Sequence, residues 1–226
     1  KKTAKTTAKI NKVRVPLIIA SIITLCIVVI FPIIMVSGSL FFGGWVIKEG
    51  QRQFRNGNLS EAGTKFKLAS LLLNLGKRNL DGTISFLELL KLKELARGVG
   101  QGSRMLVSLS KGGTYLITAS QDTQILVKGI LGQDKSISYG QLLSNIKGNL
   151  TLADMEMALV EADAKTDSFQ ELLQLPGFGL IRPALQEAVI RLQDVREVVR
   201  YSRNAMSLTP EVIGLFGKRT YLLVFQ

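Results

Sequence analysis

Few side chains of this sequence combine in a pattern that could do chemistry. Histidine is absent, and the only cysteine, Cys26, lies inside an apolar run. Zinc-type sites need several such ligands and a disulfide needs a second cysteine, so both are excluded within the chain. We therefore predict no metal site, no cofactor and no catalytic residue that depends on histidine or cysteine.

Two small groups of polar residues remain as candidates. Ser110 and Lys111, with Ser108 nearby, could supply a nucleophile and a base, but adjacent residues on a helix point apart. Asp163 and Asp167 stand four apart on one predicted helical face, whereas a hard cation needs six or more oxygen ligands. We interpret both groups as surface residues and predict that the chain is not an enzyme.

A glycine-rich stretch could suggest a phosphate-binding loop. Gly98-Val99-Gly100-Gln101-Gly102 lacks the G-x-G-x-x-G order and follows a helical pattern where the nucleotide fingerprint needs a strand. We interpret it as a flexible corner between helices.

Charge is unevenly distributed. The formal net charge is +12, and half of it comes from six basic residues in the first fourteen positions, which contain no acid. Further along, basic and acidic residues are interspersed, as on a solvated helix face and unlike a phosphate-tracking groove. We predict no nucleic-acid partner.

The apolar run from Val15 to Ile47 carries no charge. A bilayer needs about 20 such residues, and a cleavable signal peptide has a shorter apolar region. Phe41, Phe42 and Trp45 gather near its end, as aromatic residues do at a membrane interface. The basic tail before the run predicts a cytoplasmic N-terminus. We expect a single-pass transmembrane helix in the plasma (inner) membrane, with the lipid bilayer as a partner and the larger part outside the cytoplasm.

The residues after this run have helical spacing. Asn56-Gly57-Asn58 interrupts the first series and predicts a helical hairpin. The segment Gly57-Asn58-Leu59 and the residues after it resemble the turn and second helix of a tetratricopeptide repeat. Gly148-Asn149-Leu150 begins a second, non-tandem copy, and we interpret both copies as helix-turn-helix corners.

Further helices are expected along the remainder of the chain. Their predicted ranges are 85–97, 103–131 with an interruption at Gly112-Gly113, 150–175, and 180–206. The last carries one apolar stripe, formed by Leu185, Val189, Leu192, Val195, Val199 and Met206. A short final helix is expected from Thr209, and residues 220–225 have the composition of a buried strand.

The fold class expected from these patterns is mainly α, with one N-terminal transmembrane helix, an extracytoplasmic helical bundle and a terminal β-strand. The predicted division is a basic tail at 1–14, the transmembrane helix at 15–47, the helical stalk or bundle at 48–217 and the start of a truncated domain at 218–226. Because the first residue is Lys1 and a lone strand is unstable, we expect the chain to be a fragment.

The order of tail, apolar run, helical stalk and terminal strand resembles one bacterial cell-envelope family, catalogued as domain of unknown function 4012. Two segments carry the resemblance: Leu175-Pro176-Gly177 and Gly214-Leu215-Phe216-Gly217-Lys218-Arg219-Thr220-Tyr221-Leu222-Leu223-Val224-Phe225-Gln226. The resemblance implies an anchored envelope protein linked to surface-polymer assembly, with no established activity.

Three functions stay open at this stage. The first is a non-catalytic helical module that positions an extracytoplasmic domain. The second is a spacer for a C-terminal enzyme or binder of envelope polymer. The third is a tetratricopeptide-like adaptor for partner peptides. Envelope proteins or surface polymer are the expected partners besides the bilayer, and the oligomeric state is left open.

Overall fold

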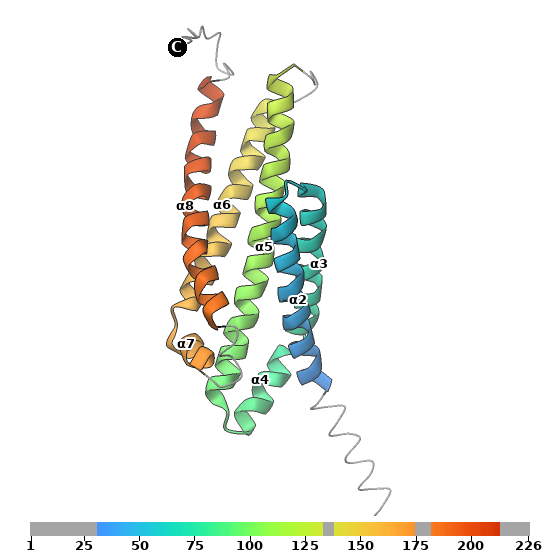
Figure 1. Ribbon diagram of the computed structural model, residues 1–226, viewed down its shortest axis with the longest axis vertical. Coiled ribbons are helices and arrows are strands. Elements are labelled where there is room, and N and C mark those ends of the chain that lie inside the picture. The colour runs from blue at the N-terminus through green and yellow to red at the C-terminus, as the bar shows by residue number, and fades with distance from the viewer. Residues whose placement is uncertain (1–30, 133–137, 175–181, 213–226) are drawn as a thin grey trace, which may run out of the picture.

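The computed structural model describes residues 31–132, 138–174 and 182–212, and this part of the chain is helical (Figure 1). Its helices are α2 (Phe31–Arg55), α3 (Leu59–Lys77), α4 (Leu80–Leu89), α5 (Lys93–Ile130), α6 (Tyr139–Ala164), α7 (Asp167–Gln174) and α8 (Arg182–Val212). They form an elongated bundle, and α5 is the longest of them with 38 residues.

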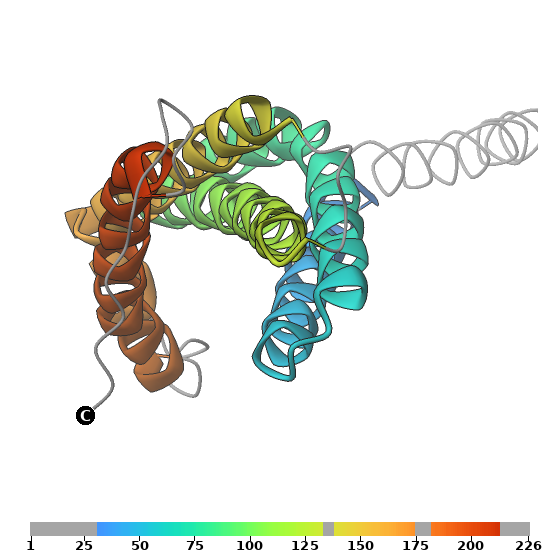
Figure 2. The ribbon, with the colours of Figure 1, turned by 90° about the horizontal axis from the view of Figure 1, so that it is seen from above.

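Helix α5 lies at the centre of the bundle (Figure 2). It packs against α3 on one side and against α6 on another, while α2 pairs with α3 and α8 pairs with α6. The short helices α4 and α7 also contact α5. Every other described helix except α8 therefore has a substantial contact with α5, and α8 packs mainly on α6.

The predicted hairpin at Asn56-Gly57-Asn58 is confirmed. Gly57 has φ of 77° between α2 and α3, a conformation that glycine adopts without steric cost. Lys91, with φ of 60°, turns the chain between α4 and α5, and this break divides the helix expected over 85–97.

Three other predicted breaks are wrong. Gly98–Gly102 and Gly112-Gly113 lie inside α5, and Gly148-Asn149 lies inside α6. Two of these glycines, Gly100 and Gly113, serve close packing, because the missing side chain lets a neighbour approach. At Gly100, for example, a Cβ would lie 3.3 Å from Ile84 Cδ1 of α4.

The core between α2, α3 and α5 is packed around the side chain of Phe66 on α3. A Cβ on Gly113 of α5 would overlap its ring, and one on Gly50 of α2 would lie 3.1 Å from it. Ser110 Oγ donates a hydrogen bond of 3.1 Å to the Phe66 carbonyl oxygen. The phenyl ring is 5% exposed, so it fills the space that the two glycines leave between the three helices.

The predicted transmembrane helix is contradicted. Residues 15–30 lie outside the described part, and the rest of the apolar run lies in α2. Val36, Val46 and Ile47 of α2 are buried, the last two in a cluster with α3 and α5. Among the described helices, none has both the length and the apolar character that crossing a bilayer requires. The single-pass topology and the inner-membrane localisation predicted from this run are therefore not supported.

The fold-class prediction as a whole is therefore wrong. It combined a membrane-spanning helix, a helical bundle and a terminal strand, but the residues with described structure contain neither the first nor a strand of any kind. The strand expected at 220–225 lies outside those residues. Inside them, α8 continues through Pro210 to Val212 where a separate short helix was expected.

Replacing Gly113 by alanine tests whether the steric clash with Phe66 outweighs the higher helix propensity of alanine. We expect Gly113→Ala to lower the free energy of unfolding by roughly 1–3 kcal/mol, because its methyl group must displace the Phe66 ring. Gly102→Ala in the same helix is the matched control, since a Cβ there meets nothing within 4 Å. It should raise the free energy of unfolding by up to about 1 kcal/mol. Urea unfolding measures both, and a stabilising Gly113→Ala would contradict the packing.

Candidate functional site

The serine and lysine considered as a catalytic pair point to different helices. Ser110 is fully buried and its hydroxyl is donated to the Phe66 carbonyl of α3. Lys111 is exposed, and its Nζ lies 3.7 Å from Glu156 Oε1 of α6. Ser108 is buried as well. In this geometry Lys111 cannot take a proton from Ser110. Instead, Ser110 connects α5 to α3 and Lys111 connects α5 to α6.

The two aspartates considered as a cation site lie on different helices. Asp163 lies near the end of α6, where its Oδ1 accepts a hydrogen bond of 3.2 Å from Arg104 Nη2 of α5. Asp167 begins α7, after the turn at Lys165 and Thr166. In the residues that the structure describes, no three His, Cys, Asp or Glu side chains are grouped so as to hold a metal ion.

The glycine-rich stretch borders a small cavity between α4 and α5. Its volume is about 250 Å³ and it is lined by Ile84, Glu88, Ala96, Arg97, Gly100, Gln101 and Arg104. Gln101 Oε1 is buried there without a hydrogen-bond partner among the described residues. The two arginines at this cavity already pair with Glu94 and Asp163 and have side chains about 60% exposed, so they do not form an enclosed binding site.

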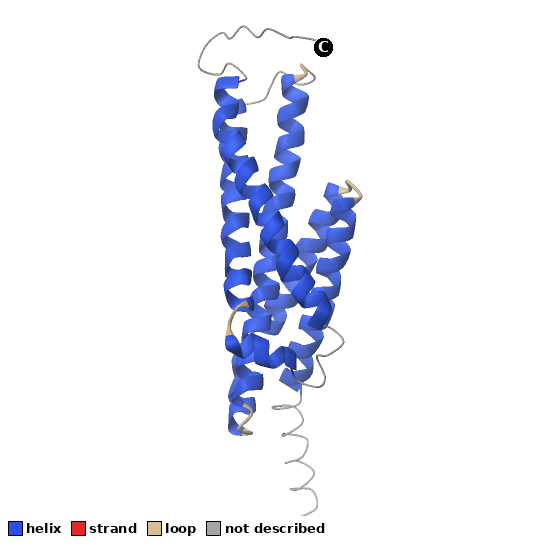
Figure 3. Ribbon diagram, turned by 60° about the vertical axis from the view of Figure 1, so that its left-hand side comes forward, coloured by secondary structure: helices blue, strands red, loops and turns tan. Residues whose placement is uncertain are grey.

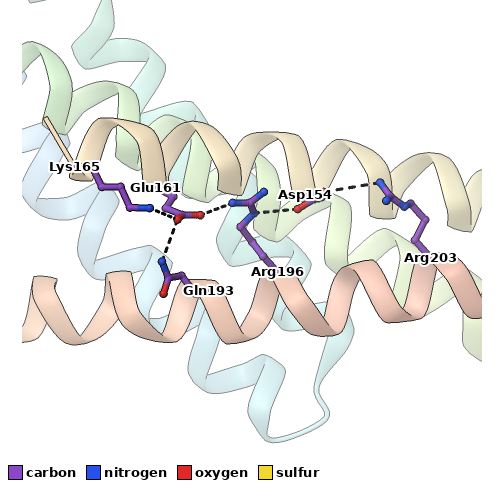
Figure 4. A network of polar contacts seen from close by, with 6 residues as sticks. All are labelled: Asp154, Glu161, Lys165, Gln193, Arg196 and Arg203. Atoms are coloured by element: carbon purple, nitrogen blue, oxygen red, sulfur yellow. Dashed lines mark hydrogen bonds and ion pairs between the residues drawn. The ribbon is translucent and has the colours of Figure 1, made fainter.

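The most extensive polar arrangement lies between α6 and α8 (Figure 4). Arg196 of α8 reaches two carboxylates of α6, donating from Nε to Asp154 Oδ1 at 3.0 Å and from Nη1 to Glu161 Oε2. Arg203, one heptad further along α8, forms an ion pair of 3.9 Å with Asp154 Oδ2. Arg196 therefore joins two carboxylates that lie seven residues, about two helical turns, apart along α6.

Glu161 has the most partners in this network. Its Oε1 accepts hydrogen bonds from Lys165 Nζ at 2.5 Å and from Gln193 Nε2 at 3.0 Å, in addition to the bond from Arg196. The hydrogen bonds from Lys165 and Gln193, and then that from Arg196, lower the pKa of Glu161 to about 2, although burial acts in the opposite direction. The side chains of Glu161 and Asp154 are only 15% and 16% exposed, so water screens this network less than a surface pair.

The acidic residues of α6 form two rows. Asp154 and Glu161 bind α8, whereas Glu156 and Asp163 pair with Lys111 and Arg104 of α5. The members of each row are seven residues apart, as Arg196 and Arg203 are on α8, which places them on one face. The seven-residue spacing of these charged residues could have been recognised in the sequence. The sequence does not show, however, which helices the two acidic rows face.

Comparisons with protein-family models, with curated proteins and with solved structures find no match to this chain. The resemblance to the envelope family therefore stays a prediction. The function must be argued from the geometry of the bundle.

The network makes a prediction about pH. Because Glu161 has a lower pKa in the folded chain than its ordinary 4.5, its stabilising effect is complete above about pH 4.5 and is lost as the pH falls toward about 2. At pH 7, Glu161→Gln should lower the free energy of unfolding by roughly 1–2 kcal/mol. That difference from the unchanged chain should shrink between pH 4.5 and pH 2.5 in urea unfolding.

Glu197→Gln is the matched control, because Glu197 is exposed on α8 and accepts its hydrogen bond from Tyr201, one turn further along the same helix. It should change the free energy of unfolding little at any pH. A difference between Glu161→Gln and the unchanged chain that stays constant down to pH 2.5 would show that the network does not hold Glu161 ionised.

Proposed function

We propose that residues 31–212 act as a non-catalytic helical spacer that holds the segments attached at its two ends apart. The observation that carries this proposal is the placement of those ends. Phe31 begins α2 at one end of the elongated bundle, and Val212 ends α8 at the other (Figure 1). At a rise of 1.5 Å per residue, the 38 residues of α5 extend for about 57 Å between them.

A continuous core supports a rigid spacer. Two apolar clusters, around Phe66 and around Met157, lie on different sides of α5 at the level of Gly112 and Gly113, and a third cluster, around Ile146, follows further along α5 and α6. Leu109 of α5 packs against the first two, and Leu116 packs against the second and third. Because the clusters share these side chains, a bend between them would expose apolar surface to water.

The roles of the former candidate residues support a non-catalytic module. Ser110, Lys111 and Asp163 each join α5 to a neighbouring helix. A residue that holds two helices together in the resting structure is poorly placed to act on a substrate. Structural use of these side chains favours a spacer over an enzyme in this part of the chain.

A peptide-binding adaptor is the second candidate. It is favoured by the confirmed hairpin at Gly57 and by exposed apolar side chains on the outer faces of α3 and α6. The concave surface of tetratricopeptide proteins requires at least three stacked repeats, and the second predicted repeat corner at Gly148 lies inside α6. If the chain binds proteins, the outer helix faces are better suited to this than a repeat groove.

The spacer proposal can be tested with two pairs of spin labels. Cys26→Ser removes the native thiol, and Ser37→Cys with Asn204→Cys then labels exposed positions near the start of α2 and the end of α8. About 33 Å of helix separates Arg182 from Asn204, and α8 begins in the half of the bundle in which α2 begins (Figure 1). The long helices run along the length of the bundle (Figure 3). Double electron-electron resonance should give one narrow distance distribution beyond about 30 Å.

The matched control pairs Ser37→Cys with Lys77→Cys. Gly76 of α3 lies against Ser39 of α2, so these labels sit on neighbouring helices. Helix axes that pack side by side are about 8–10 Å apart, and the distance should be below about 20 Å. A broad distribution for the distant pair, or one that overlaps that of the near pair, would contradict a rigid spacer.

A further inference from the structure

The turn between α2 and α3 exposes an Asn-Gly pair. Asn56 and Gly57 follow Arg55, the last residue of α2, and both are exposed at the tip of the hairpin (Figure 1). Gly57 has φ of 77°, and a Cβ on it would meet nothing within 4 Å. Within the residues that the structure describes, the Asn56 carboxamide has no hydrogen-bond partner. The carboxamide can therefore rotate toward the backbone nitrogen of Gly57.

An exposed Asn-Gly pair can react without an enzyme. When the backbone amide of Gly57 loses its proton, its nitrogen can attack Cγ of Asn56, because the product is a five-membered ring. The bond from Cγ to the Gly57 nitrogen forms, the bond from Cγ to Nδ2 breaks, and Nδ2 leaves as ammonia. Glycine favours this step, since no Cβ hinders the attacking nitrogen.

Water completes the reaction by opening the cyclic imide. Attack of water at Cγ restores the normal main chain and leaves aspartate. Attack at the main-chain carbonyl carbon leaves isoaspartate, in which Gly57 is linked through the side chain of residue 56. In both cases one water is consumed, one ammonia is released and a carboxylate replaces the carboxamide, which is a covalent modification that adds a negative charge.

Hydrogen bonds at the end of α2 control access to the attacking nitrogen. The Gly57 N–H donates to the Phe54 carbonyl oxygen at 3.0 Å, and the Asn58 N–H donates to that of Gln53 at 2.9 Å. The first bond must open before the ring can close. Helix ends open at a lower free energy than helix interiors, so this restraint is weak. The folded chain therefore leaves Asn56 reactive.

The other asparagines are in less reactive surroundings. Asn149, for example, lies inside α6, and Asn58 Nδ2 donates a hydrogen bond of 3.0 Å to Glu61 Oε2. In the part of the chain that the structure describes, every asparagine except Asn56 precedes a leucine, an isoleucine or an alanine, whose Cβ hinders ring closure; these are Asn58, Asn74, Asn79, Asn145, Asn149 and Asn204.

We propose that Asn56 is a site of spontaneous deamidation and that the hairpin turn makes it reactive in the folded chain. The new carboxylate follows Arg52 and Arg55 and lies before the N-terminus of α3, where negative charge is favourable. Because the reaction needs no enzyme, the modified fraction increases with the age of the chain. This modification goes beyond the spacer function and does not depend on it.

Incubation of the folded full chain at mildly alkaline pH, followed by peptide mass spectrometry, tests this proposal. The peptide that contains Asn56 should gain the mass difference between a hydroxyl and an amino group, and chromatography should separate its aspartyl and isoaspartyl forms. Conversion at Asn56 should be at least about tenfold faster than at Asn149, because the interior of α6 opens less often than the end of α2. Asn56→Gln should lose the reaction, since the longer side chain would have to close a larger ring.

Lys147→Asn is the matched control, because it places the same dipeptide inside a helix. Lys147 is exposed on α6, Gly148 follows it, and a Cβ on Gly148 would meet nothing within 4 Å. In the folded variant the new asparagine should react at least about tenfold more slowly than Asn56. In urea, where the helices are lost, the two pairs should react at similar rates.

Two results would overturn the proposal. One is an Asn56 that stays unmodified in the folded chain over the time in which the urea-unfolded chain is converted, which would show that the turn protects it. The other is a folded Lys147→Asn variant whose helical pair reacts as fast as Asn56, which would show that the dipeptide alone determines the rate. Neither result changes the spin-label distances expected for the spacer, so the two proposals fail separately.

Discussion

The close packing of α3 on α5 is the constraint on which the rest of the structure depends. The ring of Phe66 occupies the space above Gly113, and no larger residue than glycine leaves that space open. Gly50 provides the matching space on α2. Because protein interiors are close-packed, these small residues determine where the neighbouring helices lie, and α5 becomes the axis of the bundle.

The outer helix α8 is attached by ion pairs as well as by apolar contacts, unlike the glycine-packed centre. Leu192 and Val199 are buried against the bundle, but between them Arg196 joins two partly buried carboxylates of α6. Such bridges add direction to an apolar contact, because a guanidinium can satisfy both carboxylates only in one register. The α6 helix therefore links the glycine-packed centre to α8, and its acidic rows determine how α8 lies along the spacer.

Some of this structure could be predicted from the sequence. The hairpin at Gly57 follows from a local turn signal, and the burial of Leu192 and Val199 follows from helical periodicity. The break predicted at Gly112-Gly113 was wrong because glycine serves both turns and close approach, and only the packing of Phe66 against Gly113 decides between them. Features that depend on one helix or one turn alone could thus be predicted from the sequence.

The remaining errors share one physical cause, which is that a linear sequence does not identify the neighbours of an apolar or charged face. The apolar run that ends at Ile47 suits a lipid neighbour or a protein neighbour equally well, and its buried residues Val46 and Ile47 lie against α3 and α5. Glu161 and Arg196 are 35 residues apart, so their pairing depends on the bundle itself. Expected segments outside the described residues, such as the strand at 220–225, stay predictions.

Native-state hydrogen exchange tests the central role of α5 most directly. If α5 is the axis, its amides between Ser103 and Ala119 should exchange only through global unfolding, because all the helices packed on it must separate first. The amides in the last turns of α8 should exchange at a lower free energy, since that helix rests mainly on α6. An α5 centre that exchanges as easily as the end of α8, in a chain that otherwise unfolds cooperatively, would contradict this account.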